Sequence, residues 1–133
     1  MYIVEIFLPI MSFDWQFSGI ISILIACVSF LLAIAAVIQF KQQRTTVNPI
    51  TPSSASSLVS GGVFRLSRNP MYLAMFGILL AWGIWLENFA SLILMFGFIP
   101  YMNRFQIYPE ETAMRQLFGS NYLDYCQKVK RWL

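Results

Sequence analysis

The chain has 133 residues, of which 58% are hydrophobic and only 11% are charged, and its formal net charge is +3. Soluble domains carry about 25% charged residues, so this composition excludes an ordinary soluble protein and predicts a single membrane domain. The sequence contains no histidine, which removes the commonest ligand of zinc and haem sites and excludes Ser-His and Cys-His catalysis. We therefore expect no metal site.

Residues 17–40 form the first predicted element, an uncharged and apolar run. A bilayer core of about 30 Å is crossed by roughly 20 residues of α-helix, so this run is long enough to span a membrane. Residues 1–16 precede it, and we expect an interfacial or partial helix there, because their apolar part is too short to cross alone. They carry neither a basic start nor a small-residue cleavage site, which argues against a removable signal peptide.

Residues 45–69 form a predicted cytoplasmic loop that is rich in proline, serine and glycine. This composition is typical of a flexible linker. Two features favour a cofactor loop instead. The pair Gly61-Gly62 allows the backbone to approach a ligand closely, and apolar side chains surround it. These side chains belong to Leu58, Val59, Val63 and Phe64.

Two shorter apolar runs follow, residues 71–86 and 89–102. Only Glu87 and Asn88 separate them, so they predict a tight helical hairpin over residues 70–103. Tyrosine and tryptophan residues near the ends of both runs suit the headgroup level of a membrane, where aromatic side chains anchor helices. The hairpin would complete an arrangement of about three spans.

The distribution of charge predicts the orientation of these spans. All nine basic residues fall on one side of a three-span arrangement, whereas the other side receives only Glu5, Asp14 and Glu87. By the positive-inside rule the basic side is cytoplasmic. Topology and headgroup contact then explain the net charge, and a nucleic-acid partner is not expected. Cys27 and Cys126 fall at opposite depths, which predicts two free thiols.

Residues 104–133 change to an amphipathic pattern that predicts a cytoplasmic helical cap. Pro109 suits a first helical position, and Glu110 and Glu111 fall in the first turn, where the helix dipole favours acids. Glu111 and Arg115 have the i, i+4 spacing of a helical ion pair.

The end of the predicted cap contains a break and a basic tail. Gly119 indicates the stop of the first cap helix, and a second short helix is expected from Ser120. The chain then ends in a basic, aromatic segment that suits the membrane surface. This segment contains Lys128, Lys130, Arg131 and Trp132.

Polar residues gather at the predicted cytoplasmic mouth of the hairpin. Arg68 and Asn69 stand just before Pro70, which starts helices well and keeps the preceding residue extended. Glu110 and Glu111 follow the exit of the hairpin, where an α-ammonium group could lie near them. The alternative interpretations are a positive-inside arginine, a helix cap and two partners of the helix dipole.

The polar residues belong to an ordered set of motifs. LVSGGVFRLSRNPMYL occupies residues 58–73, the Glu110-Glu111 pair follows the hairpin, and LFGSNYLDY occupies residues 117–125. This set closely resembles the isoprenylcysteine carboxyl methyltransferase and phospholipid methyltransferase superfamily over somewhat more than the last half of the chain. A glutamate pair alone is not specific, but the ordered set with a membrane hairpin between its halves is.

The resemblance implies an all-α integral membrane enzyme that transfers a methyl group from S-adenosyl-L-methionine (SAM). The cofactor would lie between the loop before the hairpin and the cap after it. The residues that fall on the family's cofactor-contacting positions are Ser57, Leu58, Val59, Phe64, Asn69, Pro70, Met71, Tyr72, Glu110 and Glu111. Arg68 and Arg104 are expected in catalytic roles, where each would hold an anionic group. For Arg104, the positive-inside rule is the alternative explanation.

The sequence departs from the family pattern at four positions. The family often has histidine at the position of Asn69, tyrosine at Phe64 and glycine at Ala74. Its substrate-binding arginine meets Gln106 here, and Arg104 is the nearest basic residue. These departures leave the cofactor prediction in place and leave the acceptor open.

The expected acceptor is a lipophilic molecule in the membrane, such as a prenylated compound or a lipid. SAM is an activated electrophile, so an ionised carboxylate needs no general base, which favours an isoprenylcysteine-like acceptor. A phospholipid or another small lipid is the alternative, and an NADPH-dependent membrane reductase or a non-enzymatic scaffold are the rival functions. We expect a multi-pass protein of a prokaryotic inner membrane with its site on the cytoplasmic face.

Overall fold

The computed structural model describes residue 6 and residues 13–42 and 57–133, and within these ranges all regular elements are helices. The predicted all-α class is therefore confirmed. The elements are α2 (Ser18–Gln42), η3 (Gly62–Arg65), α3 (Pro70–Trp85), α4 (Phe89–Phe96), α5 (Phe98–Met102), η4 (Asn103–Ile107) and α6 (Tyr108–Lys128). Most of residues 1–16, where a helix was expected, and part of the loop at residues 45–69 lie outside the described residues.

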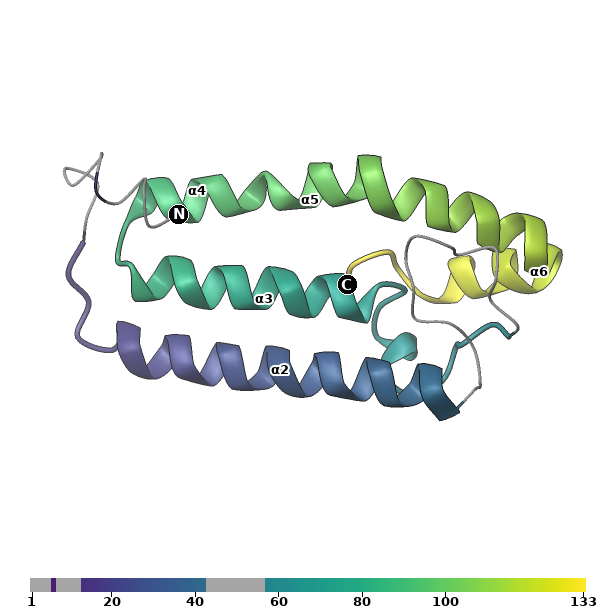
Figure 1. Cartoon of the computed structure of the whole chain (residues 1–133), viewed down its shortest axis with the longest axis horizontal. Helices are drawn as coiled ribbons and strands as arrows, with labels where there is room; N and C mark the ends of the chain where they lie inside the picture. Colours follow the sequence, from purple (N-terminus) through teal and green to yellow (C-terminus); the bar gives the residue numbers. More distant parts are fainter. Residues whose placement is uncertain (1–5, 7–12, 43–56) are drawn as a thin grey trace.

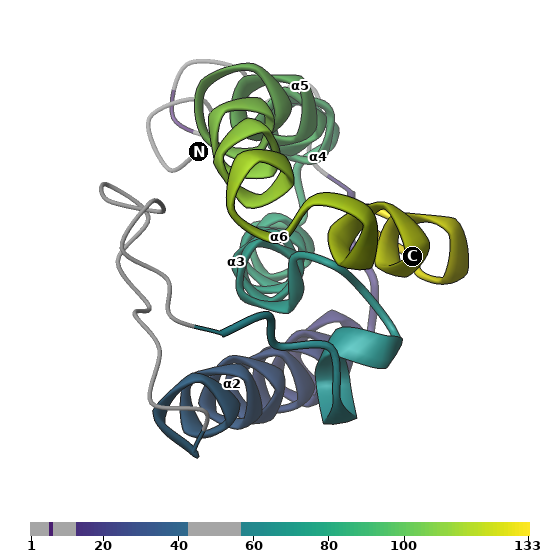
Figure 2. The same ribbon diagram turned by 90° about the vertical axis from the view of Figure 1, so that its right-hand side faces the viewer.

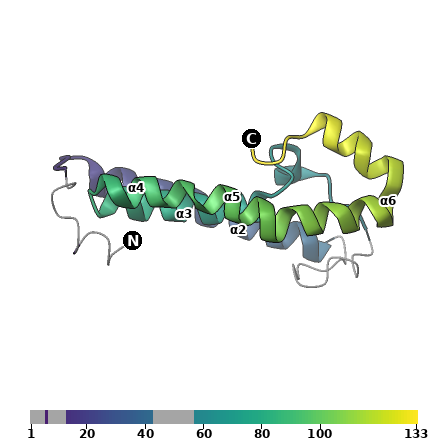
Figure 3. The same ribbon diagram turned by 90° about the horizontal axis from the view of Figure 1, so that it is seen from above.

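Three helical rods lie side by side with α3 in the middle (Figures 1 and 2). Helix α3 packs against α2 on one side and against α4 and α5 on the other. The rods form one layer, and the layer is flat when it is seen from above (Figure 3). The second half of α6 and the residues before α3 cover one end of it, which is also where the C-terminus lies.

Helix α2 is apolar on its outside and has small residues on its inside. Its buried residues are Ser18, Ser22, Ser29 and Ala36, whereas most of its large apolar side chains are exposed. It is long and apolar enough to cross a membrane, and only 17% of its most apolar window is buried. Small residues let helix backbones approach closely in a membrane, while large apolar side chains face the lipid. Among the described helices, α2 alone meets both the length and the hydropathy needed for a span.

Close packing of α2 on α3 depends on Gly77. A Cβ atom added at this glycine would lie 2.1 Å from Ser29 Oγ and 3.1 Å from Ser29 Cβ. Any larger residue must therefore push the two helices apart or shift the serine. By contrast, a Cβ at Gly19, near the other end of the same interface, would make an ordinary contact of 3.7 Å with Trp85.

We expect Gly77→Val to lower the free energy of unfolding by about 2 kcal/mol, since overpacking a tight interface costs about 1–3 kcal/mol. Thermal unfolding of the purified protein in detergent measures this loss. Adding Ser29→Gly, which removes the opposing Cβ, should recover part of it, and Gly19→Ala is the control that leaves stability nearly unchanged. Equal stability of Gly77→Val and the wild type would contradict this packing.

The turn between α3 and α4 lies where the sequence predicts it. Glu87 adopts a positive φ of 50°, and the buried Asn88 caps α4 with its side-chain oxygen. That oxygen accepts hydrogen bonds from the backbone N–H groups of Ala90 at 2.9 Å and Ser91 at 3.2 Å. The Ser18 hydroxyl donates to the Glu87 carboxylate and ties the turn to the start of α2.

The third rod confirms one expectation and adds to it. Pro109 lies in the first turn of α6, as predicted, but α6 begins at Tyr108 as a continuation of α4, α5 and η4 (Figure 1). The continuity has a local cost, because Pro109 has no N–H and its ring would clash with the carbonyl four residues earlier. The chain widens into a π-helical turn at η4 directly before this proline.

Gly119 breaks α6 as predicted. Its backbone adopts φ 52° and ψ −124°, which a residue with a side chain rarely adopts. The second half of α6 turns back from the first (Figure 3). Tyr122 and Tyr125 from this half join a buried cluster with Phe64 and Ala36. The break therefore folds the end of α6 onto α2 and the loop before α3.

Candidate functional site

A pocket of about 90 Å³ lies where the loop before α3 meets α2 and α6. It is lined by Phe40, Ser57, Leu58, Val59, Phe64, Arg68, Asn69, Glu110, Glu111, Met114, Tyr122 and Tyr125. Eight of these residues are predicted site residues. The fold therefore brings together the loop before the hairpin and the helix after it.

The remaining predicted residues lie beside the pocket or away from it. Pro70 is buried, Met71 packs against the apolar cluster behind the pocket, and Tyr72 contacts a lining residue. Arg104 is different, because it lies on η4, is exposed and does not line the pocket. The structure does not bring Arg104 to the site.

A larger cavity of about 360 Å³ lies at the other end of α2 and α3, near the Glu87 turn. Its lining is apolar apart from Ser22 and has no charged side chain. Chemistry on a polar ligand needs oriented polar groups, which the smaller pocket contains and this cavity lacks. The smaller pocket is therefore the candidate site.

Apolar side chains from three elements form one wall of the site. Val59 and Phe64 are 7% and 4% exposed. The ring of Phe64 meets that of Phe40 edge to face at 5.1 Å, and its carbonyl accepts a hydrogen bond of 2.6 Å from the Tyr125 hydroxyl. Burial raises the pKa of Tyr125 above its usual value, so this hydroxyl remains a donor at neutral pH. The wall is thus fixed by α2 and α6.

The two glycines of the loop have different environments. Gly62 adopts a positive φ of 51°, and a Cβ there would lie 1.4 Å from the Gln39 side chain. With its amide oriented to satisfy both partners, Gln39 donates to the Gly61 carbonyl at 2.9 Å and accepts from the Val63 N–H at 3.3 Å. Gly61 has no neighbouring atom within 4 Å of an added Cβ. Only Gly62 is required for the approach of the loop to α2.

These glycines test the SAM site that the sequence predicts. Gly62→Ala should displace the loop and weaken binding of S-adenosylhomocysteine, the product that SAM becomes when it gives up its methyl group, by at least about tenfold, because the strained backbone and the clash with Gln39 act together. Gly61→Ala is the matched control and should bind like the wild type. Calorimetric titration of both variants measures the difference. Equal binding by the two alanine variants would show that the loop does not form the site.

Glu110 and Tyr72 connect the starts of α6 and α3. The Tyr72 hydroxyl donates a hydrogen bond to the Glu110 carboxylate. Burial raises the pKa of Glu110 above its usual value, although the Tyr72 hydrogen bond acts in the opposite direction. A carboxylate that is partly shielded from solvent and accepts a hydrogen bond from one neutral donor attracts a cation strongly.

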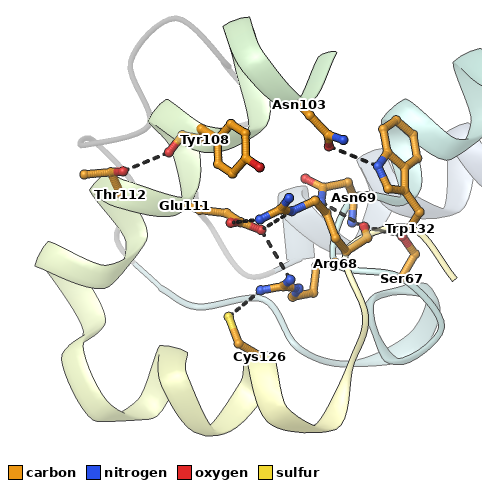
Figure 4. A network of polar contacts seen from close by, with 10 residues as sticks. Ser67, Arg68, Asn69, Asn103, Tyr108, Glu111, Thr112, Cys126 and Trp132 are labelled. Atoms are coloured by element: carbon orange, nitrogen blue, oxygen red, sulfur yellow. Dashed lines mark hydrogen bonds and ion pairs between the residues drawn. The ribbon is translucent and has the colours of Figure 1, made fainter. Parts of the chain in front are cut away.

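The expected ion pair between Glu111 and Arg115 is corrected by the structure, because Glu111 pairs with other arginines. Arg115 is exposed, whereas Glu111 is 5% exposed and lies near the guanidinium of Arg68 (Figure 4). Arg131 donates to both carboxylate oxygens, at 3.0 Å and 2.8 Å, and Arg68 approaches one of them at 3.4 Å. An exposed helical pair is worth only about 0.3–0.5 kcal/mol, so the tertiary contacts decide the partner.

The side chain of Arg68 lines the pocket and is 12% exposed, and its neighbours do not pair with all of its donors. Its Nη1 atom contacts the sulfur of Cys126. Its Nε atom is buried and has no hydrogen-bond partner among the described residues. A buried donor without a partner is rare, which points to a ligand that would accept its hydrogen bond. Cys126 and Cys27 are free thiols, as predicted.

The C-terminal residues make contacts that the sequence did not predict. Residues 129–133 leave α6 and fold back onto the mouth of the hairpin, and we call them the C-terminal strap. The carbonyl of Lys130 accepts from the Arg68 N–H at 3.0 Å, and that of Arg131 accepts from Asn69 Nδ2 at 2.9 Å. The Trp132 indole donates to Asn103 at 3.1 Å. Arg131 and Trp132 therefore tie the strap to the residues around the site, and Figure 4 shows the contact of Trp132 with Asn103.

Sequence reasoning missed this role, because a basic and aromatic ending is typical of both a membrane-surface segment and a folded strap. Asn69 does not take the alternative role of a helix cap, since its side chain makes no capping hydrogen bond to α3 and binds the strap instead. The site as a whole combines a buried carboxylate, a guanidinium with an unused donor and an apolar wall. Such a set can hold a zwitterionic group next to an apolar ring.

Comparison with known proteins assigns the chain to a family. Residues 17–121 match the phospholipid methyltransferase family. A protein of Haemophilus influenzae, described as uncharacterized, is 48% identical over 63 residues, which cover 47% of this chain and all of that protein. No solved structure matches the chain. Because the match covers four fifths of its length, the chain belongs to the phospholipid methyltransferase family.

Proposed function

We propose that this protein is a SAM-dependent methyltransferase that acts on a lipophilic acceptor in the membrane, with SAM bound in the pocket between the loop before α3 and helix α6. One observation carries the proposal. The pocket is lined by the half-buried Glu110, by Arg68, whose buried Nε donor has no partner among the described residues, and by one apolar wall. An amino-acid group attached to a nucleoside has a cation, an anion and a ring that match these three features.

The residues fit the cofactor chemically, although the pocket must widen to admit it. Ligand pockets measure about 300 Å³ or more, whereas this one has about 90 Å³. Glu110 would hold the ammonium group of SAM, Arg68 its carboxylate, and Tyr72 would orient Glu110. Leu58, Val59 and Phe64 would surround the adenine, and Asn69 would contact a polar group. The bound cofactor supplies an activated methyl group on a sulfonium.

The exposed apolar surface supports a position in the membrane. Helices α2 and α3 and the α4–α5 rod would cross it together, since α3 is flanked on both sides and the outward side chains of α2 are apolar. The pocket end carries the basic residues of the cap, so it would face the cytoplasm. For a prokaryotic protein this membrane is the inner one. A lipophilic acceptor could then reach the pocket from the bilayer without leaving it.

The acceptor we favour is already ionised, with an isoprenylcysteine-like carboxylate as the first candidate. Such a group needs only positioning next to the sulfonium and exclusion of water. An amine acceptor, as in a phospholipid headgroup, is the second candidate and needs a base to remove its proton. Glu110 does not supply this base, because the proposal assigns its carboxylate to the ammonium group of SAM, and this also favours the ionised acceptor.

Ligand binding by the purified protein in detergent tests the cofactor assignment. The wild type should bind S-adenosylhomocysteine with measurable heat and should not bind NADPH. Glu110→Ala should abolish the signal. Binding of NADPH in place of S-adenosylhomocysteine would instead identify a membrane reductase, and the absence of either signal would identify a non-enzymatic scaffold.

A further inference from the structure

The charge of Glu111 is neutralised unequally by its two arginines. Arg131 makes two hydrogen bonds to it, at 3.0 Å and 2.8 Å, which is the bidentate geometry of a strong charge-assisted pair. Arg68 is 3.4 Å away from one oxygen, which is longer than an ordinary N–H···O hydrogen bond. Arg131 is therefore the principal hydrogen-bond donor to this buried carboxylate.

Arg131 is held in place by contacts other than Glu111. Its guanidinium lies over the ring of Tyr108, 4.6 Å from the centroid. Its carbonyl accepts hydrogen bonds from Asn69 Nδ2 and from the Ser67 hydroxyl, at 2.9 Å and 3.3 Å. The strap thus positions this guanidinium between the start of α6 and the loop before α3. The pair with Glu111 is formed before any ligand arrives.

Because Arg131 makes the hydrogen bonds to Glu111, Arg68 keeps a hydrogen-bond donor that is not used by Glu111. Arg68 lines the pocket, and its buried Nε has no partner among the described residues. If Arg131 were absent, the buried Glu111 would have Arg68 as its nearest cation. A buried carboxylate without a full partner costs several kcal/mol, so it would recruit the Arg68 donors for itself. The pocket would then lose its anion-binding group.

We propose that Arg131 is a positioning residue that gives the site its selectivity for a carboxylate-bearing cofactor, because its pairing with Glu111 keeps Arg68 available to the ligand. This inference rests on the proposed function and extends it to the C-terminal strap. Arg131 contacts no ligand itself. It acts through Glu111 on Arg68.

Two ligands that differ only in a carboxylate test the inference, namely S-adenosylhomocysteine and its decarboxylated analogue. The wild type should bind the first at least about tenfold more tightly, as expected for one charge-assisted hydrogen bond. In Arg131→Gln the affinity for S-adenosylhomocysteine should fall by about the same factor, while that for the analogue stays unchanged. The ratio of the two affinities is the readout, because a general loss of structure would weaken both ligands equally.

The double variant Glu111→Gln/Arg131→Gln is the matched control. It removes the carboxylate that would recruit Arg68, so the wild-type ratio should return. If Arg131→Gln does not fold, Arg131→Lys provides the same test, because lysine keeps the charge but cannot form the bidentate pair and should lower the ratio. An unchanged ratio in the single variant that folds, or an equal loss for both ligands, would overturn the inference. Failure of the wild type to bind either ligand would instead contradict the proposed cofactor.

Discussion

Glu110→Gln should weaken binding of S-adenosylhomocysteine by a factor of about 30 or more at pH 7.5, since removing one member of a buried charge pair costs about 2–5 kcal/mol. The amide keeps the size of the side chain and can still accept the Tyr72 hydrogen bond, so the loss reports the charge alone. Asp124→Asn, at an exposed acid of α6, is the matched control and should bind like the wild type. Calorimetric titration measures all three proteins.

The same substitution predicts a pH dependence. Burial raises the pKa of Glu110 above its usual value of 4.5. The carboxylate that attracts an ammonium group exists above this pKa and is lost below it, while the ammonium remains charged. Affinity of the wild type should therefore be full at neutral pH and fall as the pH is lowered through the Glu110 pKa, and Glu110→Gln should show no such fall. Parallel curves for the two proteins would exclude Glu110 as the group that binds the cation.

Glu111→Ala should cause the largest loss of stability, about 3–5 kcal/mol of the free energy of unfolding, because it leaves two partly buried guanidinium groups without their anion. Glu111 is 5% exposed and joins the loop before α3 to the strap through Arg68 and Arg131. The substitution should therefore release both segments at once. Denaturation of the purified protein in detergent measures the effect.

Two comparisons separate this effect from a general cost of losing an acid on α6. Asp124→Ala removes an exposed carboxylate from the same helix and should change stability by less than about 0.5 kcal/mol. The charge-balanced double variant Glu111→Gln/Arg131→Gln should be more stable than Glu111→Ala, since fewer uncompensated charges remain. A Glu111→Ala protein as stable as the Asp124→Ala control would show that the ion pairs do not hold the site.

The elements that depend on a short stretch of residues could be predicted from the sequence. Residues 17–40 are uncharged and apolar over the length of a span, and α2 occupies nearly this range. Gly119 lies at a point where the chain needs an unusual backbone conformation, and the helix breaks there. Each of these features depends on a short stretch of residues. None requires knowledge of a distant partner.

The rest depended on contacts between distant residues. The i, i+4 spacing favoured Arg115 as the partner of Glu111, but the observed partners are 20 residues later and 43 residues earlier in the chain. The strap was missed for the same reason, because nothing local distinguishes Arg131 from a surface arginine. The position of Pro109 in the first turn of α6 was predicted, but the continuity of α6 with the preceding helices through a π turn was not, because it depends on the packing of the third rod.

Methyl transfer in membranes tests the central proposal most directly. Membranes that contain the protein are incubated with SAM labelled in its methyl group, and lipid-soluble products are extracted and identified. Label should appear in a lipophilic product with the wild type and should be nearly absent with Glu110→Gln, and the position of the methyl group will distinguish a carboxylate from an amine acceptor. Equal labelling in membranes that contain the wild type and in membranes that lack the protein would contradict the account.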